Sequence, residues 1–355
     1  MRVLFDITHP VHVHFYRYLI AGFLARGDAV CVTARDKDFA LALLKHLGIA
    51  HVCLSRRRSS LPGMLLELGL RNARMFRVVR AFRPDVMVAA EGGVSIGLSG
   101  ALCGIPRVVF DQVDRAPFQQ LVGTTFATVV CTGTSYLKTH RGDHRRFRGC
   151  LAQAYLDPRR FRPDLARLRA AGVNPDEPYS VLRIVKWGAT HDIGRAGCTP
   201  EQVREFAGRL RKYGRVFITS EQPLAAELEE YRLPLAPLYL HDLLAGAAVC
   251  AAEGGTVAVE AGILGTPAVL FHTYEFGYIR ELEQRYGIIV RAPGVAAAMD
   301  WAERLLQDRA ARRTWQEKRR RLFEDTDDVL ARMREVIESV AGAERRAAGP
   351  GRTTP

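Results

Sequence analysis

The chain has 355 residues, more than one hydrophobic core usually serves, so its length favours two domains. With 48% hydrophobic and 25% charged residues, it is typical of globular proteins and excludes a disordered or fibrous chain. No apolar run approaches the ~20 residues that cross a bilayer, and the amino terminus lacks a signal-peptide pattern. Seven scattered cysteines, an odd number, favour reduced thiols, so we expect a cytoplasmic protein.

The formal net charge of +13 raises the question of an acidic partner. The basic runs have no aromatic-rich motif or zinc pattern beside them, so we expect solvated arginines and no nucleic acid partner. Residues 61–82 interleave leucines with Arg71, Arg74, Arg77 and Arg80. Such an amphipathic basic helix could rest on an anionic membrane, although packing of its apolar side into the core is the favoured interpretation.

In the first half of the chain, short β-type runs alternate with helix-length periodic segments. We expect strands at 2–7, 29–33, 51–54, 86–90 and 107–110, and helices at 15–26, 39–47, 61–82 and 94–103. This alternation predicts a parallel, doubly wound sheet. A stretch rich in charge and proline, residues 141–178, interrupts it, and we place the domain boundary there, with domains at 1–160 and 161–340.

The same alternation restarts in the second half. We expect strands at 179–185, 215–219, 248–252, 268–271 and 288–291, and helices at 199–213, 224–231, 257–264, 296–307 and 312–340. The last helix is long enough to pack back on the first domain. Residues 341–355 are rich in Gly, Pro and Arg, and we expect a disordered tail.

Ligands of doubly wound sheets bind beyond the carboxyl ends of the strands, so the strand-to-helix loops are examined for chemistry. The first loop carries His9, His12 and His14. Imidazole titrates near neutral pH and can take a proton from a hydroxyl nucleophile, so one interpretation is a general base. The other is helix capping at the surface. No carboxylate or thiol spacing nearby completes a metal-ligand set, and we expect no metal.

Two further loops of the first half carry acidic residues. Glu91 is followed by Gly92 and Gly93, which either let a ligand approach the backbone or only make a turn. Asp111 and Asp114 follow the strand at 107–110. They suit recognition of hydroxyl groups, and helix capping would explain one aspartate but hardly both.

The fourth loop joins the strand at 248–252 to the next helix and contains Glu253, Gly254, Gly255 and Thr256. Backbone amides at such a helix start form a ready phosphate site. Glu260 lies one helical turn after Thr256, within reach of a ribose attached to that phosphate. The alternative is a glycine turn followed by a solvent-facing glutamate.

Four separated segments resemble the bacterial and archaeal domain-of-unknown-function family 354. They are DITHPVHVHF at 6–15, WGATHD at 187–192, FITSE at 217–221 and GTVAVEAGILGTP at 255–267. The resemblance covers nearly the whole chain up to about residue 340. Val257 and Gly262 stand where the family leads us to expect methionine and alanine, and these changes affect packing more than chemistry.

That family is similar to the GT-B superfamily, which includes UDP-N-acetylglucosamine 2-epimerases and the N-acetylglucosaminyl transferase that makes lipid II. The resemblance implies an α/β fold of two Rossmann-like, doubly wound domains facing a central cleft, with the acceptor on the first and the nucleotide on the second. It implies that Gly254, Gly255, Thr256 and Glu260 hold diphosphate and ribose, and that His12 lies near the reacting centre. The transferase's glycine-rich loop is replaced by His9 and Pro10.

We therefore expect a glycosyltransferase that moves a sugar, UDP-linked by this resemblance, to a hydroxyl acceptor in polysaccharide, envelope or natural-product glycan synthesis, without cofactor. His12 removes the acceptor proton, and Asp111 and Asp114 orient the acceptor. Helix starts at Thr256 and after Trp187, with Lys186, stabilise the departing diphosphate. His191 is a third catalytic candidate beside His12 and Asp111, and the further substrate-binding candidates are His9, His14, Glu91, Gly92, Gly93, Asp192, Ser220, Glu221 and Glu253.

Two alternatives remain open from the sequence. An epimerase would use the same donor with Glu91, Asp111, His191 and Asp192 around the sugar, but the amino-terminal Gly-Thr-Arg-Pro-Glu pattern associated with those epimerases is missing. The other is a nucleotide-binding scaffold without chemistry, which fold alone does not exclude.

Overall fold

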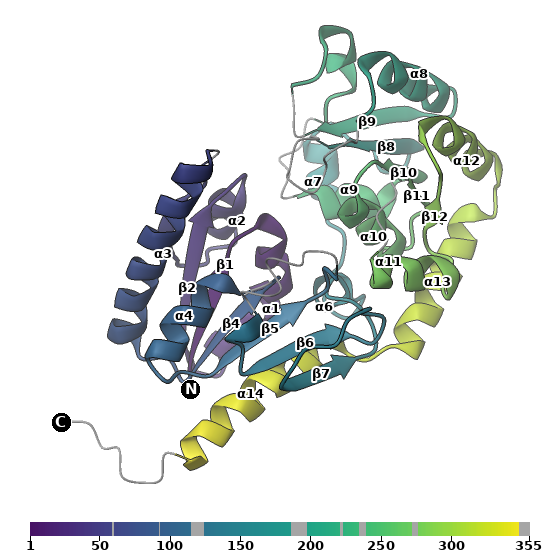
Figure 1. Ribbon diagram of the computed structural model, residues 1–355. Helices are drawn as coiled ribbons and strands as arrows, with labels where there is room; N and C mark the ends of the chain where they lie inside the picture. Colours follow the sequence, from purple (N-terminus) through teal and green to yellow (C-terminus); the bar gives the residue numbers. More distant parts are fainter. Residues whose placement is uncertain are drawn as a thin grey trace. The chain divides into compact units, whose positions relative to one another are not determined.

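The computed structural model describes residues 1–58, 60–91, 93–114, 124–185, 197–220, 223–233, 239–271 and 276–347. The chain forms two compact units (Figure 1). Unit 1 comprises Met1–Tyr155 and the segment from Thr326 onward, and unit 2 comprises Leu156–Asp325.

Unit 1 is built on a parallel sheet. Its elements are β1 (Arg2–Ile7), α1 (Pro10–Ala25), β2 (Ala29–Asp36), α2 (Ala40–His46), β3 (Val52–Arg56), α3 (Leu61–Phe82), β4 (Val86–Ala90), α4 (Val94–Leu102), β5 (Arg107–Asp111), β6 (Val129–Gly133), β7 (Asp143–Phe147), α6 (Gln153–Leu156), which ends in unit 2, and α14 (Val329–Ala347). The strand order among the described residues is β3-β2-β1-β4-β5-β6-β7. Strands β4 and β6 are buried along their whole length, and β4 is contacted by both α4 and α14.

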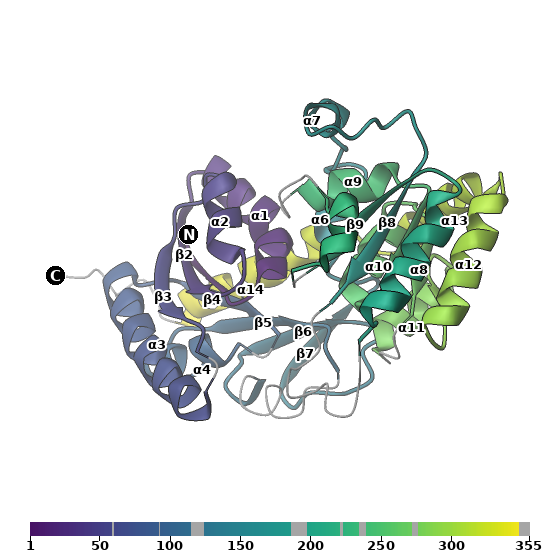
Figure 2. The same ribbon diagram turned by 90° about the horizontal axis from the view of Figure 1, so that it is seen from above.

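The helices of unit 1 divide between the two faces of this sheet. Helices α1, α2 and α14 pack on one face, where α14 contacts β4, β5 and α1. Helices α3 and α4 pack together on the other face, as Figure 2 shows. Met75 and Val79 of α3 are buried there against Leu4 and Met87 of the sheet.

Unit 2 repeats the architecture on a second parallel sheet. Its elements are α7 (Leu165–Ala170), β8 (Tyr179–Ile184), α8 (Pro200–Arg211), β9 (Arg215–Ser220), the 3-10 helix η1 (Ala226–Tyr231), α9 (Leu240–Gly246), β10 (Val249–Ala252), α10 (Gly255–Ile263), β11 (Ala268–Leu270), α11 (Gly277–Gln284), β12 (Val290–Arg291), α12 (Val295–Gln307) and α13 (Ala311–Asp325). The strand order among the described residues is β12-β11-β10-β8-β9. Helices α8 and α12 pack against each other and against the sheet, and α9 packs on α10.

The predicted fold class is confirmed, since both units are doubly wound parallel α/β structures. Residues 141–178 were predicted to interrupt the alternation of strands and helices. This prediction is wrong for Asp143–Phe147, which forms strand β7 at the sheet edge. Among the described strands β7 pairs with β6 alone, and as an edge strand it lacks the apolar alternation of a buried strand. Strand β6 was not predicted either.

The long helix predicted at 312–340 is two helices, α13 and α14. Between them, Asp327 joins the chain to Arg148: its carboxylate accepts from the Arg148 amide at 2.9 Å, and its own amide donates to the Arg148 carbonyl at 3.0 Å. The tail prediction is wrong for residues 341–347, which continue α14 because alanine, glutamate and arginine are strong helix formers. Residues 348–355 lie outside the described residues. No helix of the described ranges is both long and apolar enough to span a membrane.

Candidate functional site

The carboxyl ends of β1, β4 and β5 lie side by side in unit 1. These strands are parallel neighbours, with Asp6 opposite Ala89 and Ala90 opposite Phe110. The loops that carry the histidines, Glu91 and Asp111 therefore leave the sheet at one edge. This is the edge at which doubly wound sheets bind ligands.

The first loop is shorter than predicted, because α1 begins at Pro10 and not at residue 15. His9 is the residue before the helix, and its Nδ1 accepts from the Val11 amide at 3.3 Å. Proline suits the first helical position because it lacks an amide proton that would go unpaired there. His12 and His14 thus belong to the first turns of α1.

His12 is paired with Glu91. The ring is 1% exposed, its Nδ1 lies 3.3 Å from the Thr8 amide, and its Nε2 lies 3.3 Å from Oε2 of Glu91. Because the Thr8 N–H can only donate, Nδ1 is the acceptor and Nε2 carries the proton toward Glu91. The Glu91 side chain remains 25% exposed. Its backbone φ of 49° is in the left-handed region, a strained conformation that often marks functional sites.

The electrostatics of this edge keep Glu91 ionised. Burial opposes its ionisation, but the hydrogen bond from His12 and the Lys37 ammonium lower the pKa of Glu91 below its usual range. Burial first, and the Lys37 ammonium second, lower the pKa of His9 to about 3. Lys37 follows β2 at the same edge, so its position after a strand was a signal that the sequence analysis did not use.

Asp111 is the second carboxyl at the edge, and it is 1% exposed. Burial raises the pKa of Asp111 to about 7, and the negative charge of Glu91 adds to this rise. Two hydrogen bonds to the carboxylate oppose the rise, one from the Val113 amide at 2.9 Å and one from the Tyr136 hydroxyl at 3.1 Å. Nε2 of His140 lies 3.2 Å from that hydroxyl. Tyr136 and His140 follow β6, a strand that the sequence analysis missed, so they were not predicted.

The other predicted residues of unit 1 have different surroundings. Asp114 is buried and accepts from the Leu137 amide at 3.3 Å. His14 stacks on Tyr155 at 5.4 Å between ring centroids, and residues two apart in a helix face different sides, so it does not join His12. Gly93 precedes α4 with φ 51°, where an added Cβ would lie 2.7 Å from Val109.

In unit 2, the loop between β10 and α10 has the geometry of an open helix start. Gly254 is the residue before α10, and no side chain caps the helix there. An added Cβ at Gly254 would lie 2.9 Å from Val185, and one at Gly255 would lie 2.8 Å from Ile279. Thr256 is exposed. The two glycines are therefore required by the close packing of Val185 and Ile279, and the residue before α10 offers no side chain to cap its first amides.

Glu253 holds the backbone beside this turn. Its side chain is buried, Oε2 accepts from the Val185 amide at 3.0 Å, and Oε1 accepts from the Cys198 amide at 2.8 Å. Glu253 therefore holds the backbone of Val185 and of Cys198 close to the start of α10.

Glu260 is neither exposed nor isolated. It is 4% exposed, and its Oε1 lies 3.1 Å from Nε2 of His241, which is also buried. The interpretation of a solvent-facing glutamate is therefore wrong. His241 lies on α9, which packs on α10. The sequence analysis missed His241, because it had predicted no helix at that position.

Six predicted residues, Gly92, Lys186, Trp187, His191, Asp192 and Glu221, lie outside the described residues. Ser220 ends β9 and is half-buried. Within the described ranges, no group of three or more His, Cys, Asp or Glu side chains is arranged to hold a metal ion.

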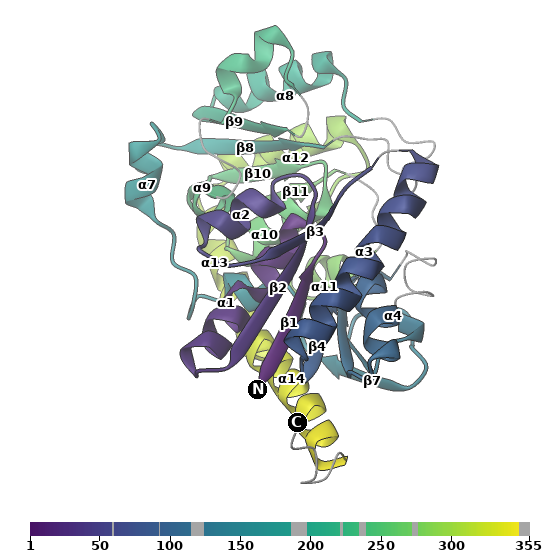
Figure 3. The same ribbon diagram turned by 90° about the vertical axis from the view of Figure 1, so that its left-hand side faces the viewer.

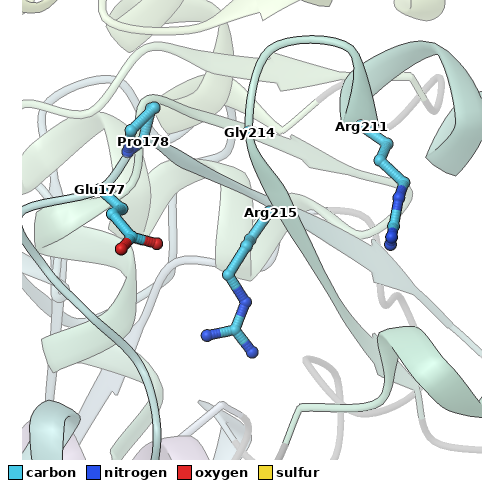
Figure 4. A pocket seen from close by; sticks show the side chains of 5 residues that line it. All are labelled: Glu177, Pro178, Arg211, Gly214 and Arg215. Carbon is cyan, nitrogen blue, oxygen red and sulfur yellow. The ribbon is translucent and has the colours of Figure 1, made fainter.

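A hollow of about 390 Å³ lies elsewhere in unit 2 and is lined by Glu177, Pro178, Arg211, Gly214 and Arg215 (Figure 4). Pro178 and Gly214 precede β8 and β9, so the hollow is at the amino ends of these strands. This is the edge opposite to the loops described above. Because ligands of this architecture bind at carboxyl ends, the hollow does not mark the candidate site.

Sequence comparison relates the chain to proteins without an assigned function. Residues 1–116 match the model of a family described as a protein of unknown function, DUF354. An uncharacterized protein of Methanocaldococcus jannaschii is 24% identical over 296 residues, which cover 77% of this chain and 82% of that protein. The family match ends before unit 2, so the resemblance of the later segments stays a prediction.

Structure comparison relates the chain to sugar enzymes. The glycosyltransferase VinC, solved in complex with dTDP, superposes with a TM-score of 0.62 at 14% identity, covering 97% of this chain and 100% of that one. The UDP-GlcNAc 2-epimerase from Neisseria meningitidis, solved with bound UDP-GlcNAc, superposes with a TM-score of 0.62 at 11% identity. The match covers 96% of this chain and 99% of that one. At these identities the likeness establishes a GT-B-like fold and leaves the activity open.

Proposed function

We propose that this protein is an enzyme that binds a nucleotide-activated sugar in unit 2 and transfers the sugar to a hydroxyl acceptor. The observation that carries the proposal is the start of α10, where a glycine turn without a side-chain cap stands beside the buried His241–Glu260 pair. Two structures of the same fold hold dTDP or UDP-GlcNAc, which supports a nucleotide as the ligand.

The start of α10 suits a diphosphate. The first amides of a helix lack intrahelical acceptors and carry the positive end of the helix dipole, so they bind anions. Glu260 lies one turn further along α10, and His241 fixes its side chain. We assign the ribose hydroxyls to Glu260, and we assign Glu253 to positioning the adjacent backbone.

In unit 1 we assign the proton-accepting role to Glu91 and not to His12. Glu91 is ionised and 25% exposed, whereas His12 is 1% exposed and has partners for both ring nitrogens. The Glu91 carboxylate takes the proton of the acceptor hydroxyl, whose oxygen bonds to the anomeric carbon. The bond from that carbon to the diphosphate breaks, and the nucleoside diphosphate leaves with the bonding electrons. His12 is a positioning residue for Glu91.

One observation favours epimerisation as the second candidate. Asp111 has a pKa of about 7, whereas the pKa of Glu91 is lowered, so one carboxyl is an acid near neutral pH and the other is a base. Elimination and re-addition of a nucleoside diphosphate on the same sugar need such a pair. We rank the transferase first because its reaction needs only one catalytic group, the Glu91 base, whereas epimerisation also needs the Asp111 acid.

Incubation with UDP-, GDP- and dTDP-sugars, with and without alcohol and lipid-phosphate acceptors, separates the candidates when the sugar and phosphorus signals are followed by NMR. The proposal predicts release of nucleoside diphosphate that depends on the acceptor. Epimerisation of the sugar in the absence of an acceptor would show that the transferase proposal is wrong and that the epimerase is the better candidate. If no nucleotide sugar binds, both enzymatic candidates are wrong.

A matched pair of variants tests the nucleotide site itself. Glu260→Gln keeps the shape of the side chain but removes its charge, and we expect weaker nucleotide-sugar binding by about 1 to 3 kcal/mol. Glu230→Gln removes an exposed carboxylate of the same unit and should bind as the unmodified protein does. Titration calorimetry of the two variants decides whether Glu260 contributes.

A further inference from the structure

Helix α3 lies along one side of unit 1 (Figure 3). Its first half exposes apolar side chains. The exposed fractions are 41% for Met64, 64% for Leu65, 54% for Leu66, 41% for Leu68 and 44% for Leu70. In the second half, Met75 and Val79 are buried in the core. Core packing, which the sequence favoured, therefore accounts only for the second half of the helix.

The exposed charges around these side chains are mostly positive, with Asp36, 35% exposed and 3.4 Å from Arg56, as an acidic neighbour. The one acidic residue of α3, Glu67, is 4% exposed, and its carboxylate accepts from Arg35 at 2.6 Å and from Ser55 at 2.8 Å. The three residues Arg56–Arg58, between β3 and α3, are exposed, and Arg56 exposes 86% of its side chain. We call residues 56–58 and 62–70 together the α3 patch.

The composition of the α3 patch indicates the chemistry of its partner. An exposed cluster of large apolar side chains marks an interaction surface. Leucines beside arginines match the interface of an anionic bilayer, where acyl chains take the apolar groups and acidic headgroups take the charges. Nucleic acid would use the arginines but not the leucines. A second copy of the chain, packed patch to patch, would bring the same arginines together.

We propose that the α3 patch docks this protein on an anionic membrane surface. The leucines of the first half of α3 enter the headgroup region, and Arg57 and Arg58 contact acidic headgroups. The patch begins at the carboxyl end of β3, and the parallel order β3-β2-β1-β4 puts that end on the same sheet edge as Glu91. Docking does not depend on the proposed transferase activity.

Co-sedimentation of the full chain with lipid vesicles tests the proposal. We expect binding to vesicles of phosphatidylcholine mixed with phosphatidylglycerol, little binding to phosphatidylcholine alone, and weaker binding when salt is raised. The double variant Leu65→Gln, Leu66→Gln should reduce partitioning at least about tenfold, because two apolar side chains are lost from the bilayer. The control Leu102→Gln changes a leucine of α4 that is 69% exposed and should partition normally.

A second pair of variants tests the charges. Arg57→Glu with Arg58→Glu should reduce partitioning about tenfold or more, because each basic residue near the surface adds to the attraction. Arg320→Glu reverses a charge that is 74% exposed on α13 in unit 2 and should have little effect. All of these positions are exposed, so the variants should have unchanged circular dichroism melting curves.

The proposal is overturned if the protein sediments with neither kind of vesicle, or if the leucine variant partitions as the unmodified protein does. It is also overturned if the leucine variant abolishes a dimer, measured by light scattering, while no vesicle binding occurs. The experiment contains no sugar nucleotide, so its failure would leave the proposed function untouched.

Discussion

Among single residues, Glu91 and Asp111 show how two carboxyls at neighbouring strand ends acquire different protonation states. The His12 hydrogen bond and nearby positive charge lower the pKa of Glu91, whereas burial raises that of Asp111 to about 7. Position after a strand predicted that both residues belong to the candidate site. It could not predict their protonation, because that depends on side chains from other parts of the chain.

Replacement of Glu91 tests the assignment of the base. Glu91→Gln should lower turnover by about 10² to 10⁴ fold, the usual contribution of a general base, without weakening nucleotide-sugar binding. Asp143→Asn removes an exposed carboxylate of the same unit and should leave turnover unchanged. If Glu91→Gln stays active while His12→Gln does not, the base is His12 and our assignment is wrong.

Tyr136 should control the protonation of Asp111. Its hydroxyl donates to the carboxylate, which favours the ionised form, so Tyr136→Phe should raise the pKa of Asp111 further. In the epimerisation candidate, where Asp111 is the acid, we expect the limb of the pH–rate profile that reports Asp111 to move to higher pH. Tyr213→Phe, which removes a hydroxyl in unit 2 that accepts from Gln307, is the control. An unshifted limb would mean that Asp111 does not control it.

The fold also shows which elements a sequence pattern can predict. The bounds of α3 at Leu61–Phe82 and of β4 at Val86–Ala90 were predicted, because their apolar spacing follows one buried face or a fully buried strand. The edge strand β7 was missed because four of its five residues are polar or charged and show no apolar alternation. The His241–Glu260 pair could not be predicted, since its members lie on two helices that meet only in the folded unit.

Gly262 of α10 is a packing residue. An added Cβ would lie 2.6 Å from the carbonyl oxygen of Ile288, which also accepts from the Trp315 indole at 2.8 Å. Gly262→Ala should therefore destabilise unit 2 by about 1 to 3 kcal/mol, measured by urea unfolding followed by tryptophan fluorescence.

Gly208 of α8 provides the control for this change. It has open space around its Cα, so Gly208→Ala should be neutral or slightly stabilising through helix propensity. Equal stability of the two alanine variants would contradict the packing account of Gly262.

The whole molecule is two units whose chain order is interleaved, since the segment from Thr326 returns to unit 1. Helix α14 buries Met333 and Ile337, and it packs on β4 and β5. Truncation after Asp325 should remove this cover, so hydrogen exchange of β4 and β5 should become faster. Exchange of β8 and β10 should be unchanged. Equal acceleration in both units would show that they do not fold separately.

The central claim is that a nucleotide sugar binds at the start of α10, and hydrogen exchange with UDP- and dTDP-sugars tests it most directly. We predict that ligand slows exchange of the peptide spanning β10 and the first turn of α10, and that Glu260→Gln reduces this protection. Binding that leaves this peptide unchanged, or that protects the hollow at Glu177 and Arg215 instead, would contradict the account.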